Sequence, residues 1–279
     1  MIKTFTVGII VKNGYNEIPK AILSILLQTC QDFELIIVDD FSTDKTREYL
    51  KTLEKNKKIK VFYNREWKGK GFSRNFIIKN ASQPYIVWQD ADDISYPDRL
   101  EKTKQAILKG NSDFIFGGMN VFVNGKYHSV YNPNFSDYRH IINYMLIYGN
   151  PLSMPASCIK KEFYDEYGLY PEDGSYLDHF MEEVEFWIKA IKKSKISFIQ
   201  EPIIRYNSDN TNKRIQNRQF ANGKDIANVV FIPLMLRLYS LQELFPMLEW
   251  DKLETEKTAK KIVNDICIAK LGYKYFWRI

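Results

Sequence analysis

Three aspartates, Asp90, Asp92 and Asp93, follow the apolar run Tyr85–Trp88 within a few positions. Carboxylates this close repel one another at neutral pH, and burying like charges is costly unless a cation or a strong donor neutralises them. Mg²⁺ and Mn²⁺ prefer oxygen ligands, typically one or two protein carboxylates together with substrate phosphates. The spacing therefore favours a metal-bound phosphate substrate at the end of a strand. A solvated acidic turn before a helix that starts near Pro97 explains the same residues.

The chain around these aspartates alternates between strand-like and helix-like segments. The predicted strands are 7–11, 33–38, 59–63, 85–89 and 114–116, and the predicted helices are 17–28, 42–53, 73–81 and 97–108. This alternation predicts an α/β fold with a mostly parallel sheet flanked by helices, which binds ligands outside the carboxyl ends of its strands. Polar clusters at Asn13–Asn16, Asp39-Asp40 and Asp90–Asp93 all fall at such ends. Their expected convergence on one edge strengthens the metal hypothesis.

The second half of the chain is less regular. The expected elements are a hairpin at 121–127 around Asn124-Gly125, a helix at 182–192, strands at 196–199 and 203–206, and a polar loop at 207–213. We expect one domain at 1–218, with a nucleotide-binding half at about 1–117 and an acceptor-binding half at about 118–218. A helical C-terminal segment is expected at 219–279.

The composition is that of an ordinary globular protein, with 45% hydrophobic and 27% charged residues among 279. No apolar run reaches the roughly 18–20 residues that a membrane-spanning helix needs. The cysteines Cys30, Cys158 and Cys267 are scattered and odd in number, which favours neither a disulfide framework nor a zinc cluster and predicts a cytoplasmic location. The net charge of +6 is compatible with an anionic substrate, a phospholipid surface or nucleic acid and is too diffuse to choose between them. No nucleic-acid motif occurs, so we expect no nucleic-acid partner.

An ordered set of segments, each weakly specific alone, gives a more specific indication. The segments are Val7–Ile10, Tyr15–Glu17, Ser24–Thr29, Phe33–Asp44, Gly71–Asn75, Asp90–Asp93, Pro97–Leu100 and Glu182–Trp187. In order and spacing, over about 5–206, the sequence resembles the family 2 glycosyltransferases. The resemblance implies a GT-A fold, an inverting reaction, a nucleotide-diphosphate sugar donor (most simply a UDP-sugar) and a divalent ion, Mn²⁺ or Mg²⁺.

The resemblance also implies roles at the donor site. Asp40 is expected to accept a hydrogen bond from the nucleobase imide, because a carboxylate reads a donor; its alternative role is to cap the following helix. Arg74 is expected to pack near the nucleotide and Asp40, or else to form a surface ion pair of little energetic value. Val11 and Lys12 are the nearest residues for backbone contact with the nucleobase, and Asn16 is assigned to the same donor site.

The acidic residues receive roles in the same way. Asp90 is expected to contact the ribose, whereas Asp92 and Asp93 approach the metal. Glu183 is expected to be the general base that deprotonates the acceptor hydroxyl as it attacks. The family usually has aspartate at this place, so Glu182 is the alternative base. Both glutamates also suit a purely structural role, since acids in the first turn stabilise a helix.

These assignments predict transfer of a sugar to a hydroxyl of a cell-envelope glycan or a lipid-linked acceptor. One rival is a sugar nucleotidyltransferase, which would carry a Gly-rich phosphate loop that Asn13–Asn16 does not supply. A second is a non-catalytic nucleotide- or glycan-binding module. The basic loop Trp67–Gly71 suits either a phosphate contact or a solvated turn. Interleaved aromatic and basic residues at Lys270–Arg278 suit a peripheral contact with the inner face of the cytoplasmic membrane, and equally core packing or a dimer contact.

Overall fold

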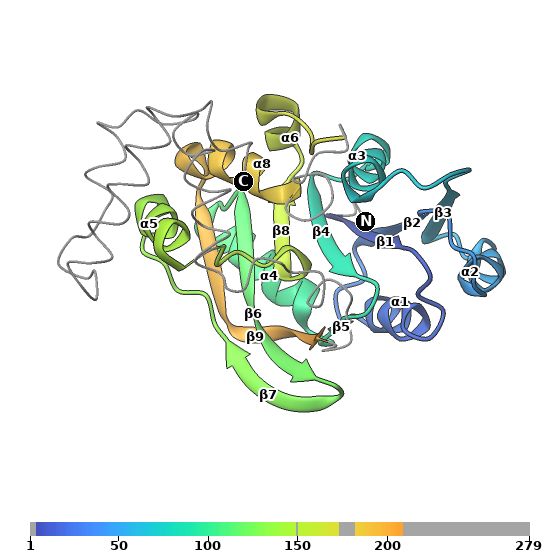
Figure 1. Ribbon diagram of the computed structural model, residues 1–279. Helices are drawn as coiled ribbons and strands as arrows, with labels where there is room; N and C mark the ends of the chain where they lie inside the picture. Colours follow the sequence, from blue (N-terminus) through green and yellow to red (C-terminus); the bar gives the residue numbers. More distant parts are fainter. Residues whose placement is uncertain (1–3, 149, 173–181, 209–279) are drawn as a thin grey trace, which may run out of the picture. The chain divides into compact units, whose positions relative to one another are not determined.

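The computed structural model describes residues 4–148, 150–172 and 182–208 (Figure 1). The chain forms two units, Met1–Asn134 with Leu152–Asn212, and Phe135–Pro151 with Lys213–Ile279. The predicted helical segment at 219–279 lies outside the described residues. No described helix has both the length and the apolar character needed to cross a bilayer.

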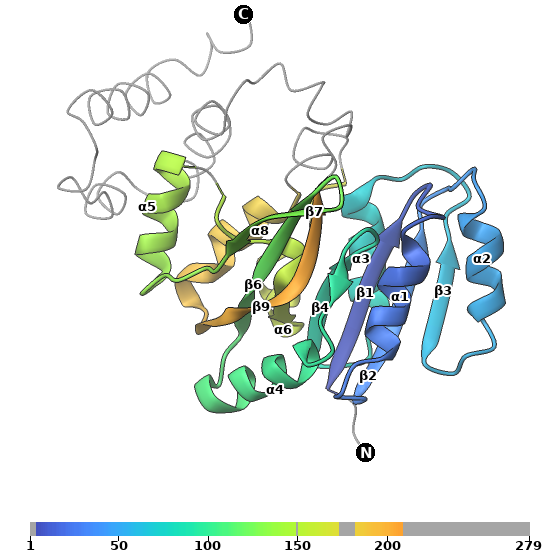
Figure 2. The ribbon, with the colours of Figure 1, turned by 90° about the horizontal axis from the view of Figure 1, so that it is seen from below.

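The first half contains every strand and helix that the sequence predicts there. Its elements are β1 Phe5–Val11, α1 Ile18–Leu26, β2 Phe33–Asp39, α2 Thr46–Leu53, β3 Ile59–Tyr63, α3 Lys70–Asn80, β4 Tyr85–Asp90, β5 Ile94–Ser95 and α4 Arg99–Gly110. Strands β3, β2, β1 and β4 lie side by side in this order and are parallel, so their carboxyl ends share one edge (Figures 1 and 2). The alternating α/β pattern is confirmed.

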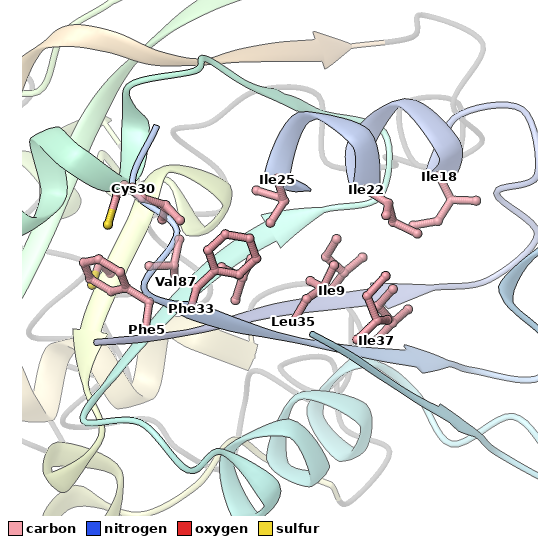
Figure 3. Packing of buried hydrophobic residues seen from close by; sticks show 14 of the residues in the cluster. Phe5, Ile9, Ile18, Ile22, Ile25, Cys30, Phe33, Leu35, Ile37 and Val87 are labelled. Carbon is pink, nitrogen blue, oxygen red and sulfur yellow. The ribbon is translucent and has the colours of Figure 1, made fainter. Parts of the chain in front are cut away.

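Helices cover both faces of this parallel sheet because both faces are apolar. On one face, Ile18, Ile22 and Ile25 of α1 are fully buried over alternate residues of β1 and β2 (Figure 3). Burying such a side chain contributes about 1.5–3 kcal/mol, so this row anchors α1. On the other face, a Cβ at Gly8 would lie 2.9 Å from the Trp88 ring and 3.0 Å from Ile77 of α3. Glycine there lets α3 approach the sheet.

The second half continues the same sheet with mixed directions. Its elements are β6 Phe114–Val123, β7 Lys126–Tyr131, β8 Ser157–Lys160, α6 Glu162–Tyr167, α8 Glu182–Ala190 and β9 Ile196–Ser208. Strand β8 runs antiparallel between β4 and β6, and β6 pairs with β9 in parallel and with β7 in an antiparallel hairpin. The sheet is therefore parallel in its first half and mixed beyond β4. The short apolar stretches of β8 and α6 gave no periodic signal from which to predict them.

The hairpin at Asn124-Gly125 is confirmed, and both residues have positive φ, as a tight two-residue turn requires. The two strands predicted at 196–199 and 203–206 form the single strand β9. Its pairing with β6 shifts register beside Gly117 and Gly118. A Cβ at Gly117 would lie 2.2 Å from Ile203, so glycine permits this irregular crossing. The apparent break in the sequence corresponds to the bulge.

In the other unit, helix α5 spans Tyr138–Tyr148. The Asp137 carboxylate accepts the backbone N–H groups of Arg139 (2.8 Å) and His140 (3.0 Å), which caps the start of this helix.

Candidate active site

The three aspartates at the end of β4 and in the turn that follows it form one cluster. Asp90, Asp92 and Asp93 each offer a carboxylate oxygen, and these oxygens lie within 4.8 Å of one another. Asp93 is 1% exposed; its Oδ1 accepts the backbone N–H of Asn207 (2.8 Å), whereas its buried Oδ2 has no hydrogen-bond partner among the described residues. Burial raises the pKa of Asp93 well above its ordinary value, and the charges of Asp90 and Asp92 raise it further. An unsatisfied, buried carboxylate oxygen beside two others fits a divalent cation.

Strand β9 brings a residue that the sequence did not assign to the cluster. Asn207 was expected to begin a polar loop, but it lies in β9, and β9 pairs with β5 directly after the aspartates. Its Nδ2 donates to the Asp92 carbonyl (2.6 Å) and its backbone N–H to Asp93. Asn207 therefore fixes the turn that carries both predicted metal ligands. The sequence pattern did not place Asn207 in a strand, because Asn207 is polar and the apolar run ends one residue earlier, at Tyr206.

A buried arginine forms hydrogen bonds with the residues on either side of the acidic cluster. Arg99, at the start of α4, donates to Gln89 Oε1 (2.8 Å), Ser95 Oγ (2.9 Å) and the Trp88 carbonyl (2.7 Å). Burial lowers the pKa of Arg99 to about 10, so the group is charged at neutral pH. In the sequence, Arg99 stands out only as part of the segment Pro97–Leu100. The structure shows that it ties the end of β4 to β5 and α4.

Arg74 of α3 lies between two of the predicted functional carboxylates. Its Nη2 is 3.5 Å from Asp90 Oδ1 and its Nη1 is 4.0 Å from Glu183 Oε2. The guanidinium lies over the Trp88 ring, 5.6 Å from the ring centre. Arg74 is 4% exposed, so the alternative of a surface ion pair is wrong.

Glu183 lies in the first turn of α8, with 15% of its side chain exposed. Asp90 and Glu183 are far apart in sequence, yet both lie within 4.0 Å of one guanidinium. The predicted base and the acidic cluster thus belong to the same site. The side chain of Glu182, the alternative base, lies outside the described residues.

A second contact ties α3 to the segment before α8. Asn75 accepts the backbone N–H of Tyr170 (2.9 Å) and donates to the Tyr170 carbonyl (2.8 Å). The Tyr170 hydroxyl is 2.8 Å from that of Tyr164, which accepts the Trp88 indole N–H (2.9 Å). Burial raises the pKa of both tyrosines well above the ordinary value, so both are neutral. Asn75, Tyr164 and Tyr170 had no pattern in the sequence that could reveal this contact.

Asp40 lies at the end of β2 and binds the loop that precedes α3. Its Oδ1 accepts Asn64 Nδ2 (2.7 Å) and the Lys68 N–H (2.9 Å), and its Oδ2 accepts the Gly69 N–H (3.0 Å). The alternative role, capping α2, is wrong, because these bonds go to the start of α3 instead. A carboxylate has about four lone-pair positions, so three bonds leave Oδ2 able to accept one more donor.

The same contacts explain two further features. Helix α3 begins at Lys70, three residues earlier than predicted, because Asp40 organises the preceding Lys68-Gly69 amides. The loop Trp67–Gly71 is held through its backbone rather than being a freely solvated turn. Asp39, next to Asp40, is buried and pairs with Arg47 at 2.8 Å.

The remaining predicted donor-site residues all follow β1 or end it. The carbonyl of Val11 accepts the Asp40 N–H (2.8 Å), and the Lys12 Nζ lies 4.8 Å from the centre of the Trp67 ring. Asn13 accepts the Thr43 N–H (2.7 Å), which braces the loop after β1 against the loop after β2. Asn16 is exposed in the turn before α1. Val11 and Lys12 are therefore beside Asp40 at the shared sheet edge.

Comparison with known proteins agrees with this geometry. Glycosyl transferase family 2 matches residues 6–167, and the chain belongs to this family. An uncharacterised glycosyltransferase of Rickettsia conorii is 31% identical over 218 residues, covering 76% of this chain and 34% of the relative. The chain thus spans about a third of that relative's length.

A second relative is an enzyme whose name states its reaction. The Escherichia coli enzyme WfgD, a UDP-Glc:α-D-GlcNAc-diphosphoundecaprenol β-1,3-glucosyltransferase, is 36% identical over 113 residues, which are 40% of this chain and 44% of WfgD. Among solved structures, S. aureus TarS 1–349 in complex with UDP-GlcNAc superposes with a TM-score of 0.62 at 19% identity, covering 97% of this chain and 73% of TarS. The GT-A type of fold is confirmed.

Proposed function

We propose that this chain is an inverting, metal-dependent glycosyltransferase that moves a sugar from a UDP-sugar to a hydroxyl of a lipid-linked or cell-envelope glycan acceptor. The observation that carries the proposal is the shared Arg74, which contacts Asp90 of the acidic cluster on one side and Glu183 on the other. The UDP-GlcNAc complex of TarS supports the donor class, and the acceptor in the name of WfgD supports a lipid-linked glycan.

Each residue then has a distinct task in the reaction. Asp40 holds the nucleobase through its remaining lone pair, and Glu183 takes the proton of the attacking hydroxyl. Arg74 orients the Glu183 carboxylate and favours its ionised form, which is the form able to accept a proton. Asp92 and Asp93 would hold Mn²⁺ or Mg²⁺, which when bound neutralises charge on the donor diphosphate.

The location belongs to the same proposal. An enzyme that uses a cytoplasmic UDP-sugar and a lipid-linked acceptor acts at the inner face of the cytoplasmic membrane. Lys270–Arg278 would supply a peripheral contact there through its interleaved aromatic and basic residues.

The test separates donor binding from transfer. Thermal shifts are recorded with UDP-Glc and UDP-GlcNAc, each with Mn²⁺, Mg²⁺ or a chelator. A ligand at a hundred times its Kd stabilises the folded state by about 2.7 kcal/mol, which is roughly 5–11 °C for a chain of this size. UDP release is then followed with a GlcNAc-diphosphate lipid acceptor.

Three variants assign the roles. Asp92→Asn should abolish the metal-dependent shift, whereas Glu183→Gln should keep the shift and lose transfer by about a hundredfold or more. Glu185→Gln, on the same helix α8 and paired with Lys189, is the matched control and should keep both. If the unmodified protein binds the UDP-sugar but transfers no sugar, the hypothesis of a non-catalytic binding module is favoured. If it forms a nucleotide sugar from a sugar phosphate and UTP, the sugar nucleotidyltransferase is favoured.

A further inference from the structure

Four aromatic residues from four different segments form a buried cluster. They are Trp88 of β4, Tyr164 of α6, Phe186 of α8 and Tyr170, which follows α6. Each is at most 3% exposed. The Tyr164 ring stacks on the Phe186 ring with 4.4 Å between ring centres and 11° between ring planes, and the Tyr170 ring meets Phe186 edge-on at 5.7 Å. The cluster therefore joins α6 and α8 to the strand that ends in the acidic turn.

Hydrogen bonds run through this cluster, although ring packing alone would not require them. The Trp88 indole N–H donates to the Tyr164 hydroxyl (2.9 Å), which lies 2.8 Å from the Tyr170 hydroxyl. A hydroxyl has one donor and two acceptor positions, so Tyr164 serves both neighbours at once. A buried polar network whose members are all bonded favours one arrangement of the core around it. Tyr164 is the member of this network that is bonded on both sides.

The cluster lies beside the two residues that carry the proposed chemistry. Glu183 precedes Phe186 by three positions in α8, and residues three apart are neighbours on one face of a helix. The Arg74 guanidinium lies over the Trp88 ring, 5.6 Å from its centre. Burial raises the pKa of Tyr170, and the charges of Arg74 and Glu183 act on it in opposite directions, so both charges are close to this ring. A rotation of α8 would change the 4.0 Å separation of Glu183 and Arg74.

The residue after Arg74 on α3 restrains the cluster a second time. Asn75 binds both the N–H and the carbonyl of the Tyr170 backbone. Tyr170 is therefore fixed to α3 by its backbone and to Tyr164 by its hydroxyl. With Tyr170 held in this way, the hydroxyl and the ring of Tyr164 connect β4, α6 and α8.

We propose that Tyr164 is a positioning residue for the transfer reaction, because its hydroxyl and its ring together fix the docking of α8 against β4 and hence the position of Glu183. The inference rests on the proposed function, in which Glu183 is the general base, and adds a residue that influences the reaction only through that base. A general base must lie within hydrogen-bond reach of the proton that it takes, and a misplacement of about 1 Å costs about a hundredfold in rate.

The experiment removes the Tyr164 hydroxyl and keeps its ring. Tyr164→Phe does this, and Tyr85→Phe is the matched control, because the Tyr85 hydroxyl at the start of β4 donates to the Ser112 carbonyl (3.1 Å). Steady-state kinetics with a UDP-sugar, Mn²⁺ and a GlcNAc-diphosphate lipid give kcat and KM at a temperature well below all melting temperatures. Calorimetry with Mn²⁺ gives the affinity for UDP.

We expect Tyr164→Phe to lower kcat by about 10- to 100-fold, with the KM for the UDP-sugar and the affinity for UDP within about twofold of the unmodified protein. Tyr85→Phe should keep kcat within about twofold, although loss of a hydrogen bond should lower its melting temperature by about 2–4 °C. Tyr170→Phe removes one of the two hydrogen bonds of the Tyr164 hydroxyl and should lower kcat by a smaller factor. This variant tests the inference even if Tyr164→Phe does not fold.

A double-mutant cycle shows whether Tyr164 acts through the base. Glu183→Gln has no base to position, so adding Tyr164→Phe to it should change the remaining transfer rate by less than about twofold. A loss as large as in the unmodified background would overturn the inference.

Two kinetic results would also overturn the inference while leaving the proposed function intact. One is a kcat within about twofold of the unmodified protein for both Tyr164→Phe and Tyr170→Phe. The other is an equal loss of kcat and UDP affinity in Tyr164→Phe, which a purely structural role would produce. A protein that transfers no sugar, or that transfers as fast with Glu183→Gln, would instead refute the proposed function and the inference with it.

Discussion

Replacing Arg74 by methionine removes the charge that two carboxylates share and keeps most of the side-chain volume. At an effective dielectric constant of about 20, unit charges 3.5 Å and 4.0 Å apart attract by about 5 and 4 kcal/mol. Asp90 is 35% exposed, so water screens much of its share, and desolvation of the buried guanidinium offsets part of the rest. Removing one partner of a buried pair typically costs 3–5 kcal/mol. We expect Arg74→Met to lose about 3 kcal/mol of stability.

The functional consequence has a definite sign. Without the neighbouring cation the ionised form of Glu183 is less favoured, so the acidic limb of the pH dependence of kcat/KM should move to higher pH. Urea unfolding measures the stability and UDP release measures the rate. Arg74→Lys keeps the charge and should keep the limb near its original pH, while Arg139→Met removes an exposed arginine of α5 as the control. An unmoved acidic limb in an Arg74→Met protein that still folds would refute the role given to Arg74.

Two further predictions concern other parts of the unit. Burial alone would raise the pKa of Glu34, but hydrogen bonds from Lys60, Thr6 and Ser82 outweigh it and lower the pKa to about 2. A depressed pKa stabilises the folded state at neutral pH, and this stabilisation is lost as the pH falls from about 4.5 to about 2. In urea unfolding, the unmodified protein should therefore be more stable than Glu34→Gln by roughly 3 kcal/mol at neutral pH, and this difference should shrink across that pH range. A difference in stability that does not depend on pH would contradict this. Asn207→Ala loses the hydrogen bond to the Asp92 carbonyl and should weaken Mn²⁺ binding about 10- to 100-fold, as measured by electron paramagnetic resonance. Unchanged Mn²⁺ affinity would exclude the role given to Asn207.

The parallel half of the fold was predictable because its strands are buried on both faces. Such strands read as continuous apolar runs, and β1, β2 and β4 do so. Strand β8 was not predictable, since four residues between irregular segments give no period. The antiparallel hairpin of β6 and β7 was predictable from Asn124-Gly125, whereas the antiparallel insertion of β8 between β4 and β6 was not.

The acidic cluster was predictable for a similar reason, since Asp90 ends β4 and Asp92 and Asp93 follow it directly, so local sequence alone places them together. The roles of Arg74 and Asn207 were not, because their contacts depend on how distant elements pack. Arg74 meets Glu183 only once α8 docks near α3, and Asn207 meets Asp93 only through a pairing that links residues 114 apart. Periodicity describes one element at a time and cannot carry this information.

Asn207 is synthesised long after Asp93, to which it donates a hydrogen bond, and this order matters while the chain is being made. Ribosomes extend chains at about 5–20 residues per second, so Asn207, which lies 114 positions after Asp93, is added about 6–23 s later. For that interval the parallel strands can pair, but the buried carboxylate of Asp93 lacks the backbone donor that it has in the finished fold. The nascent chain therefore carries an incomplete acidic turn until β9 emerges. Divalent ions or chaperones that shield this turn should raise the yield of folded protein during translation.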